Sequence, residues 1–453
     1  MKPPKSRKAE LGSNATGGEK PHAETAESAE FKMTELGPIP VDWEVAEISD
    51  LYEVRSSKRV FQSQWRSSGI PFYRARDIVG FRHGEQAIGG LFIDKALYEK
   101  YKRDYGVPSI DDLLVTAVGT LGSVFRVSNE SPFYFKDGNI IWFKSKGKYD
   151  SRLLEVLFES GFLDSQIYDT AGGSTVGTYT ISNAKKTLIP LPPLAEQRRI
   201  ARALSDVDEL ISALGKLIEK KRNIKTGTMQ ELLGMRNEEC GMRNVPRRRL
   251  AGFSSAWVEK RLGEIGDFIA GNGFPLNKQG DKSGDYPFFK VSDFNNTGNE
   301  NVLRVANNYI SESTFKELHC SLIPSGSIVF AKIGAAIALE RKRRVCYDSC
   351  IDNNMMAFCV NRQNDERFIT ECLRRVVFAD LAESTALPAL NVRKLREYKI
   401  VVPLSLAEQR AIATVLSDMD AEIAALEAKR TKYESIKQGM MQELLTGRTR
   451  LKP

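Results

Sequence analysis

A segment of 40 residues occurs twice in this chain. Residues 194–233 read LAEQRRIARALSDVDELISALGKLIEKKRNIKTGTMQELL, and residues 406–445 repeat this segment 212 positions later without a gap, with about 23 of the 40 positions identical. Chance does not produce such a match, and self-similarity at a fixed period indicates a duplicated structural unit. Whatever fold the chain adopts must therefore contain the same unit twice.

Both copies of the segment have the apolar spacing of a long helix. Apolar residues recur at alternating steps of four and three, as in a heptad seam. They are Ile200, Leu204, Val207, Ile211, Leu214 and Ile218 in the first copy, and Ile412, Leu416, Met419, Ile423 and Leu426 in the second. Forty residues predict a helix of roughly 60 Å. The charged faces favour an exposed two-helix coiled coil over the alternative, an ordinary core helix.

The starts of the two predicted helices and the glycines inside them also correspond. Ser405 and Glu408 have the spacing of a capping box at the second start, and Pro193 occupies the equivalent place in the first. Gly227 and Gly439 recur at matching positions, although glycine costs about 1 kcal/mol inside a helix. We expect a close helix crossing or a partner contact at these glycines.

A mixed segment with its own repeated pattern precedes each helix. The two segments open with Trp43 and Trp257, and residues 70–77 match residues 286–293 in position and character. Residues 111–122 parallel residues 325–337, each an apolar strand running into a glycine turn, and residues 137–139 parallel residues 352–354. This pattern predicts two related globular domains whose exposed residues have diverged.

The predicted fold class is α+β. Two homologous mixed α/β domains are separated by two long antiparallel coiled-coil helices in a pseudo-two-fold, circular arrangement. The expected order is a disordered tail (1–35), a first domain (36–190), a first repeat helix (191–235), a basic linker (236–250), a second domain (251–402), a second repeat helix (403–446) and a short tail (447–453). That tail resembles residues 247–250, which lead into the second domain, as in a chain cut from a circular order.

Composition narrows the classes of function. Lys and Arg number 66 against 58 acidic residues, so the net charge of +8 permits a polyanionic partner. No apolar run is long enough to span a bilayer, and the start of the chain lacks the apolar region of a signal peptide. We therefore expect a cytoplasmic protein without membrane association. The six cysteines and three histidines form no zinc-binding pattern, so we expect reduced thiols and no metal site.

Sequence patterns of catalysis are missing. The chain has no phosphate-binding G-x-x-x-x-G-K-[ST], no G-x-G-x-x-G after a strand, no Asn-Pro-Pro-aromatic tetrapeptide of amino-methyltransferases and no G-x-S-x-G elbow. The glycine-rich residues 172–177 lack the lysine of a phosphate cradle and are better explained as a flexible recognition loop. We expect no catalytic residues.

Binding chemistry is easier to place. Tyr73, Arg74 and Arg76 in one domain, and Phe289, Lys290 and Ser292 in the other, bring cations, a hydroxyl and aromatic rings to strand ends. Arginine can contact guanine with two hydrogen bonds, and lysine can hold a phosphate. The run 341–344, RKRR, also suits phosphate contacts. The alternatives are a surface salt-bridge face and a solvated hairpin tip.

The ends of these segments resemble one protein family. The strings at 192–198 (PPLAEQR) and 403–410 (PLSLAEQR), the openings at 39–43 and 250–257, and the closings at 229–233 and 441–447 are similar to those of the specificity (S) subunit of bacterial Type I restriction–modification systems. The resemblance covers residues 36–451 and includes the order domain, helix, domain, helix.

The resemblance implies a function. Each domain would be a target recognition domain that reads one half of a bipartite, asymmetric double-stranded DNA site. The helices would space the halves and dock two modification (methyltransferase) subunits, and restriction (translocase–nuclease) subunits would join later. S-adenosylmethionine, ATP and Mg²⁺ would be bound by those partners and not by this chain. Two such readers could meet major grooves roughly 34 Å apart, one turn of the duplex.

The resemblance and the strand-end pattern together select candidate residues. The DNA-binding candidates are Tyr73, Arg74, Arg76, Thr120, Ser174, Thr175, Thr178, Phe289, Lys290, Ser292, Lys332, Arg341, Arg343, Thr385 and Asn391. The candidates for partner-binding or structural roles are Glu196, Gln197, Arg198, Glu408, Gln409, Arg410, Gly227 and Gly439. Two rival functions remain: a coiled-coil scaffold or adaptor without DNA recognition, and a self-sufficient restriction or modification enzyme.

Overall fold

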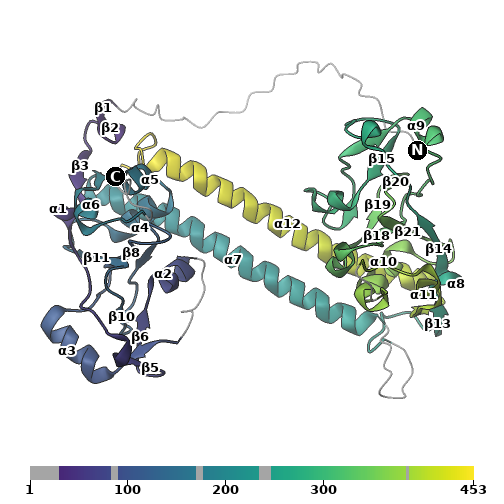
Figure 1. Ribbon diagram of the computed structural model, residues 1–453, viewed down its shortest axis with the longest axis horizontal. Helices are drawn as coiled ribbons and strands as arrows, with labels where there is room; N and C mark the ends of the chain where they lie inside the picture. The colour runs from purple at the N-terminus through teal and green to yellow at the C-terminus, as the bar shows by residue number, and fades with distance from the viewer. Residues whose placement is uncertain (1–29, 83–89, 170–176, 234–245, 384–386, 453) are drawn as a thin grey trace, which may run out of the picture. The chain divides into compact units, whose positions relative to one another are not determined.

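The computed structural model describes residues 30–82, 90–169, 177–233, 246–383 and 387–452 (Figure 1). By contacts, the chain divides into two compact units. Unit 1 comprises Met1–Glu209 together with Glu434–Pro453, and unit 2 comprises Leu210–Tyr433. Each unit therefore holds one globular domain with parts of both long helices. In the described part of the chain, no helix combines the length and the apolar character that crossing a membrane requires.

Of the predicted disordered tail (1–35), residues 1–29 lie outside the described residues. Residues 31–40 lie within the described part of the chain. Strand β1 (Phe31–Thr34) pairs antiparallel with β2 (Gly37–Pro40) in a two-stranded sheet. Residues 31–35 thus form a hairpin with the start of the first domain, which corrects the prediction for this part of the tail.

Unit 1 contains a four-stranded antiparallel sheet in the order β4 (Tyr52–Arg55), β11 (Ile140–Ser145), β8 (Leu113–Thr116), β9 (Val124–Arg126). All four residues of β8 are buried, as its uninterrupted apolar run predicts. A second sheet has the order β10 (Tyr134–Phe135), β6 (Ile70–Tyr73), β7 (Phe92–Ile93), β5 (Trp65–Arg66), and β3 (Glu44–Glu47) pairs with β12 (Leu188–Leu191). The helices are α1 (Ile48–Leu51), α2 (Ala75–Arg82), α3 (Lys95–Tyr105), α4 (Ser151–Glu159), α5 (Asp164–Asp169) and α6 (Ile181–Lys186), with the 3₁₀ turn η1 (Gln62–Gln64).

Unit 2 has the same plan with different loops. Its main sheet has the order β14 (Gly266–Ala270), β21 (Met355–Val360), β18 (Ile328–Ala331), β19 (Lys342–Val345), β16 (Val302–Leu303). Strands β17 (Asn308–Ile310), β15 (Tyr286–Phe289) and β20 (Cys350–Ile351) form a second sheet, and β13 (Trp257–Arg261) pairs with β22 (Lys399–Pro403). The helical elements are α8 (Leu262–Ile265), α9 (Glu312–Glu317), α10 (Glu366–Arg374) and α11 (Val392–Glu397), with the 3₁₀ turns η2 (Leu276–Lys278), η3 (Val291–Asn295), η4 (Ala335–Leu339) and η5 (Phe378–Leu381).

The two globular domains are copies of one fold, as the repeat predicts. A short parallel pair recurs in the same register, with Phe72 opposite Tyr134 in unit 1 and Phe288 opposite Cys350 in unit 2. The nine-residue helices α4 and α10 also correspond, because Asp150 and Asp365 each cap the helix start by accepting a backbone N–H. The duplication therefore extends through the globular domains.

The repeated segments form two helices of 39 residues each, α7 (Leu194–Leu232) and α12 (Leu406–Leu444), teal and yellow in Figure 1. Within each unit they run antiparallel. In unit 1, Lys437 lies 2.6 Å from Asp208, and in unit 2, Lys225 lies 2.6 Å from Asp420. The same ion pair is thus made twice by equivalent residues. The prediction of long antiparallel helices is confirmed within each unit.

The residues of the heptad seam are buried in two different environments. Near the helix starts, its residues belong to the domain cores: Ile200 and Leu204 pack in unit 1 with Leu444 near the end of α12. Ile412 and Leu416 pack in unit 2 in the same way with Leu232. Only farther along the helices do seam residues such as Leu214, Ile218 and Ile423 become buried outside these cores.

The repeated glycines do not mark a close helix crossing. A Cβ atom added to Gly227 or Gly439 would meet nothing within 4 Å outside the local backbone of its own helix. The prediction of a close crossing is therefore wrong, because the neighbouring helix leaves open space at both positions. The alternative prediction, a partner contact, stays a prediction.

Candidate nucleic-acid interface

An equivalent turn follows β6 in unit 1 and β15 in unit 2. The backbone N–H of Arg74 donates to Asp77 Oδ2 at 2.8 Å, and the N–H of Lys290 donates to Asp293 Oδ2 at 2.7 Å. Both aspartates are buried. Burial raises the pKa of Asp293, against the opposing effect of hydrogen bonds from the backbone N–H groups of Lys290 and Asn307. The side chains of Arg74 and Lys290 therefore extend from equivalent, fixed backbone positions in the two domains.

The aromatic candidates support this turn from inside the domain. Tyr73 is half-buried, with its ring centroid 4.9 Å from those of both Phe81 and Phe133. Phe289 is fully buried. A fully buried ring cannot reach a DNA surface, which corrects the assignment of Phe289 as a contact residue. Exposed side chains occur at Arg76, beside Asp77, and at Ser292.

Unit 2 gathers further cations beside its turn. Arg341 Nη1 donates to Asn295 Oδ1 at 2.7 Å, and the Arg343 guanidinium lies 5.2 Å from the ring centroid of Phe294. Asn295 and Phe294 belong to η3, which also carries Ser292. The structure thus brings together Lys290, Ser292, Arg341 and Arg343, called the basic cluster below. Lys290 Nζ itself donates to Gln279 Oε1 at 2.8 Å.

The RKRR run is not a uniformly solvated hairpin tip. Lys342, the second residue of the run, is 2% exposed and pairs with Glu340. Its Nζ also donates to the carbonyl of Val376 at 2.7 Å and lies 4.2 Å from the Phe378 ring centroid. Burial lowers the pKa of Lys342, although the pairing with Glu340 opposes this. Because successive side chains of a strand point to opposite faces, Arg341 and Arg343 flank the turn while Lys342 enters the interior.

A second loop with candidate residues follows β8 and β18. In unit 1, the backbone of Val118 pairs with that of Thr178, and Thr120 is exposed nearby. In unit 2, the N–H of Leu390 donates to the carbonyl of Lys332 at 2.9 Å, which brings Lys332 next to Asn391. Asn391 caps α11 and donates from its side chain to Glu383 at 3.0 Å. The remaining candidates, Ser174, Thr175 and Thr385, lie outside the described residues.

One turn links the two candidate loops in each domain. In unit 2, the N–H of Asp352 donates to the carbonyl of Phe289, and that of Lys332 to the carbonyl of Asn354. In unit 1, the N–H of Lys136 donates to Tyr73 and that of Ala117 to Asn139 in the same way. These contacts align Asn139 with Asn354, as predicted, but Lys136 and not Asp137 with Asp352. The turn joins the candidate residues into one region of each domain.

The glutamate at the start of α7 forms a buried clasp. Glu196 accepts two hydrogen bonds from Arg450, at 2.8 and 2.7 Å, and one from Trp43 Nε1 at 3.1 Å. This set, Glu196, Trp43 and Arg450, is the first clasp. Burial alone would raise the pKa of Glu196, but the hydrogen bonds from Arg450 and Trp43 outweigh it and lower that pKa.

Unit 2 repeats the arrangement as a second clasp of Glu408, Trp257 and Arg249. Arg249 donates to both carboxylate oxygens of Glu408, at 3.0 and 2.7 Å, and Trp257 Nε1 donates at 3.2 Å. The predicted capping box is thus half present. Glu408 N–H donates to Ser405 Oγ at 3.3 Å, but the Glu408 carboxylate turns to Arg249. Motif reasoning missed both arginines, although the similarity of residues 247–250 to residues 446–451 contains the signal.

The glutamines of the same motif also point inward. Gln197 Oε1 accepts from the N–H of Asp150 at 2.9 Å, and Gln409 Oε1 accepts from the N–H of Asp365 at 2.8 Å. Both glutamines are buried. Each therefore fastens the capping residue of α4 or α10 to its long helix.

The arginines of the motif are the exposed members. Arg198 is exposed and lines a polar hollow of about 440 Å³ together with Asp150 and Arg152. Arg410 is also exposed, with its Nε 3.9 Å from Asp365 Oδ2. Of the predicted partner-binding residues in this motif, Arg198 and Arg410 can be reached by another protein.

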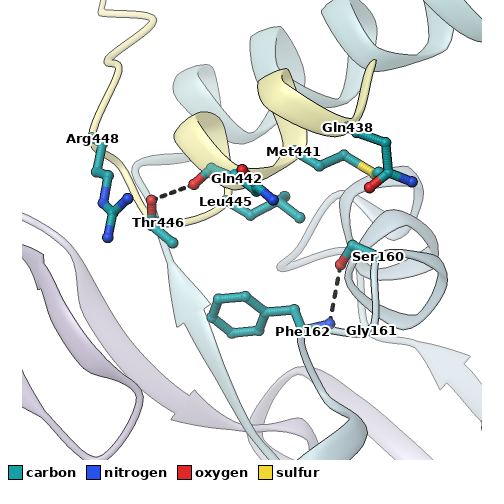
Figure 2. A pocket seen from close by; sticks show the side chains of 9 residues that line it. All are labelled: Ser160, Gly161, Phe162, Gln438, Met441, Gln442, Leu445, Thr446 and Arg448. Atoms are coloured by element: carbon teal, nitrogen blue, oxygen red, sulfur yellow. Dashed lines mark hydrogen bonds between the residues drawn. The ribbon is translucent and has the colours of Figure 1, made fainter. Parts of the chain in front are cut away.

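A groove of about 320 Å³ lies at the end of α12 in unit 1 (Figure 2). Figure 2 shows Ser160 and Phe162 on one side and Met441 and Thr446 on the other. In unit 2, Arg375 takes the place of Ser160 and donates to the carbonyl of Leu233 at 3.1 Å. The two units therefore differ in the residue at this position of the groove. Within the described ranges, no three His, Cys, Asp or Glu side chains gather to hold a metal ion.

Comparison with known families gives one clear match. The family described as "Type I restriction modification DNA specificity domain" matches residues 40–223 and again residues 254–438. Among curated proteins, the chain is 26% identical over 390 residues to the Type I restriction enzyme MjaIX specificity subunit of Methanocaldococcus jannaschii, covering 83% of this chain and 86% of that protein. It is 25% identical over 438 residues to the putative type I restriction enzyme MjaX specificity subunit of the same organism, covering 93% and 97%.

A solved structure shares the fold. The S subunit of a Type I restriction–modification system from M. genitalium superimposes with a TM-score of 0.57 at 17% identity. The superposition covers 92% of this chain and 99% of that one. The fold therefore recurs at low sequence identity.

Proposed function

Because this chain belongs to the Type I restriction–modification DNA specificity family, we propose that it is the subunit that selects the DNA sequence for such a complex. Each globular domain, or recognition domain, reads one half of a split site in double-stranded DNA. The observation that carries the proposal is a repeated frame with different side chains. The same aspartate-held turn presents Arg74 in one domain and Lys290 in the other.

The chemistry of the turns suits DNA. Arginine and lysine can contact guanine O6 and N7 in the major groove, and arginine, lysine and serine can also contact phosphates. Arg341 and Arg343 add positive charge beside the turn of unit 2. Because the two domains present different side chains on one frame, the two half-sites differ in sequence, and the full site is asymmetric.

The helices suit a spacer that also docks partners. We propose that two modification (methyltransferase) subunits bind along α7 and α12, near the exposed Arg198 and Arg410, and that restriction (translocase–nuclease) subunits join this assembly. The chain itself performs no chemistry in this proposal. S-adenosylmethionine, ATP and Mg²⁺ are bound by the partner subunits. The rival function, a scaffold without DNA recognition, leaves the two diverged domains unexplained.

The test is the methylome of cells that carry the cognate modification subunit, with and without this chain. We expect methylation at one split, asymmetric motif to require the chain. Replacing Arg341 and Arg343 with alanine should lower the extent of methylation. It should relax the sequence preference at one half-site only, because both residues belong to unit 2. Arg103→Ala is a control, since this exposed arginine of α3 in unit 1 pairs with its neighbour Asp104.

An unchanged methylome with an active modification subunit would remove the proposed function and favour the scaffold. Methyl transfer by the purified chain alone would instead favour the self-sufficient enzyme. If both half-sites relaxed equally in the double alanine variant, the assignment of one half-site to each domain would be lost.

A further inference from the structure

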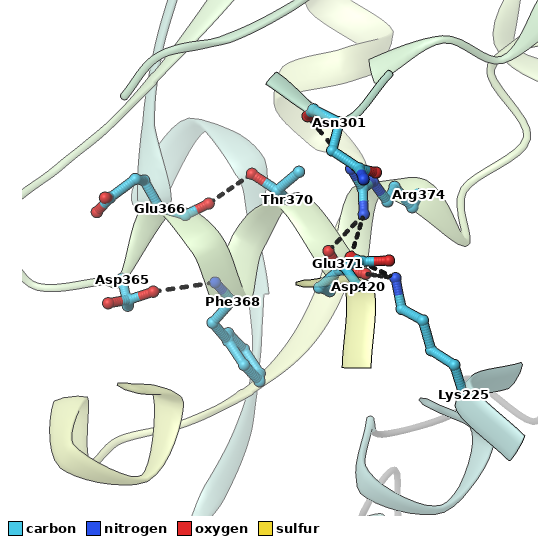
Figure 3. A network of polar contacts seen from close by, with 9 residues as sticks. All are labelled: Lys225, Asn301, Asp365, Glu366, Phe368, Thr370, Glu371, Arg374 and Asp420. Atoms are coloured by element: carbon cyan, nitrogen blue, oxygen red, sulfur yellow. Dashed lines mark hydrogen bonds and ion pairs between the residues drawn. The ribbon is translucent and has the colours of Figure 1, made fainter. Parts of the chain in front are cut away.

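Four charged side chains meet where the recognition domain of unit 2 rests on the long helices (Figure 3). Lys225 of α7 lies 2.6 Å from Asp420 Oδ2 of α12 and 3.8 Å from Glu371 Oε2 of α10. Arg374 of α10 lies 2.7 Å from Glu371 Oε1 and 3.5 Å from Asp420 Oδ2. We call this set of two cations and two carboxylates the charge lock. It joins both long helices to one helix of the domain.

The charge lock extends to the strands that carry the basic cluster. Arg374 Nη2 also donates to the carbonyl and the side chain of Asn301, both at 3.4 Å. Asn301 directly precedes β16, which pairs in parallel with β19. Arg343 lies on β19, and Arg341 directly precedes it. A continuous set of contacts therefore runs from the long helices to the proposed DNA-contacting arginines.

Unit 1 contains half of this lock. Lys437 and Asp208 are the equivalents of Lys225 and Asp420, and they form the same 2.6 Å ion pair. The matching helix caps of α4 and α10 place Val156 at the position of Glu371 and Glu159 at that of Arg374. A buried valine cannot take part in an ion pair. The helix pair is thus cross-linked in both units, and in unit 2 Glu371 and Arg374 also tie the domain helix into the pair by charge.

The difference matters because charge contacts are directional where apolar contacts are not. The side chains of Lys225 and Glu371 are 12% and 10% exposed, so water replaces their contacts poorly. Moving α10 along the long helices would leave these charges without partners, which is strongly unfavourable in a partly dry site. An apolar contact, such as that of Val156, tolerates a small slide. A slide of about two residues, at 1.5 Å each, nearly equals one base-pair step of about 3.4 Å.

We propose that Lys225 and Glu371 are positioning residues that hold the second recognition domain in register, and so set the number of base pairs between the two half-sites. This inference rests on the proposed function and deepens it. The residues act through the placement of the basic cluster and do not contact the DNA themselves. In unit 1 Val156 stands at the position of Glu371, so the test is made in unit 2.

The experiment uses the full chain assembled with its cognate modification subunits. Duplexes carry both half-sites found in the wild-type methylome, separated by the native spacer or by one base pair more or less. Methylation rates are compared for the wild type, Lys225→Met and Glu371→Val, the latter giving unit 2 the residue of unit 1. We expect both variants to lower the preference for the native spacer by about tenfold, the effect of one poorly met base contact.

Two controls separate register from folding. Lys316→Met breaks an exposed ion pair with Glu312 in the same unit and should leave the spacer preference within about twofold, since exposed ion pairs contribute little. Lys225→Arg should restore the preference that Lys225→Met loses, because it keeps the charge. A general loss of stability would slow methylation on all three duplexes equally and would leave their ratio unchanged.

An unchanged spacer ratio in both Lys225→Met and Glu371→Val would overturn the inference. So would an equal loss of preference in Lys316→Met, because the effect would then not be specific to the charge lock. If the wild-type complex methylated no split site at all, the proposed function would fail before the variants were compared. The two failures are therefore distinguishable.

Discussion

Glu196 and Glu408 are single residues that each join two distant segments of one unit. Each carboxylate is almost inaccessible to solvent and is paired with an arginine that follows the other long helix in sequence. Two-pronged arginine contacts are among the stronger charge-assisted hydrogen bonds. Both glutamates have a lowered pKa because their hydrogen bonds outweigh the effect of burial.

A pH-dependent stability follows for the second clasp. The folded pKa of Glu408 lies below its unfolded value of about 4.3. The clasp therefore stabilises the fold above that value, and this stabilisation is lost as the pH falls through the lower, folded pKa. We expect Glu408→Gln to cost about 2 kcal/mol at pH 7. Its difference from the wild type should shrink at about pH 3. Chemical denaturation at both pH values measures this.

Glu219→Gln is the matched control, because Glu219 is exposed in the same unit. It should change stability little at either pH. An equal cost of Glu408→Gln at pH 7 and at about pH 3 would contradict the role of the ionised carboxylate.

At the scale of the helices, the two glycines mark positions without a local structural requirement. Gly227 and Gly439 are exposed, and an added Cβ would meet open space at both. Gly447 differs, because it has a φ of 69° and an added Cβ would collide with Pro40. A glycine inside the helix can therefore be dispensable, while one just beyond the helix end is required.

Alanine at the exposed glycines should stabilise the chain. We expect Gly227→Ala and Gly439→Ala each to raise the free energy of unfolding by up to about 1 kcal/mol, since alanine favours the helix. Gly447→Ala should lower it. Urea denaturation of the isolated chain measures all three changes.

A loss of stability in Gly227→Ala or Gly439→Ala would contradict the open space at these glycines and would favour a close helix crossing. If both variants are stable but methylate poorly with the modification subunit, a partner contact explains the repeated glycines. Methylation equal to that of the wild type would exclude this second explanation.

At the scale of the whole molecule, each unit is completed by distant parts of the chain. Unit 1 combines residues up to Glu209 with residues from Glu434 onward, and its core includes Met441, Leu444 and Leu445. The tail adds Arg450, which pairs with Glu196 and also with Asp42 at 2.8 Å. The first domain is therefore finished by the last residues of the sequence.

Deleting residues 447–453 should destabilise unit 1 selectively. The deletion leaves the buried Glu196 without Arg450, at a cost of about 3 kcal/mol for a broken buried ion pair. Unit 2 keeps its own clasp through Arg249. Calorimetry of the full chain should show unfolding of unit 1 at a lower temperature.

Deleting residues 452–453 alone is the control, because Arg450 and Leu451 remain. It should leave the unfolding profile close to that of the wild type. An equal destabilisation by both deletions would show that the clasp does not account for the effect.

Much of the architecture follows from the sequence alone. The ungapped repeat predicts two long helices, and the matched strand segments predict two copies of one domain. Strands β8 and β18 could be located because an uninterrupted apolar run reports burial on both faces. The turns bearing Arg74 and Lys290 could be located because their sequences match between the domains. These features depend on local pattern, which the sequence states directly.

Other features were decided only by the tertiary structure. The apolar periodicity did not show that the first seam residues belong to domain cores. A helix has the same apolar spacing whether another helix or a sheet covers its apolar face. The RKRR run reads as surface charge, yet Lys342 is buried, since Glu340 nearby and Val376 and Phe378 from a distant segment provide partners. The clasps and the charge lock likewise join residues far apart in the chain. Such contacts depend on which surfaces meet, and that is settled only when the whole fold packs.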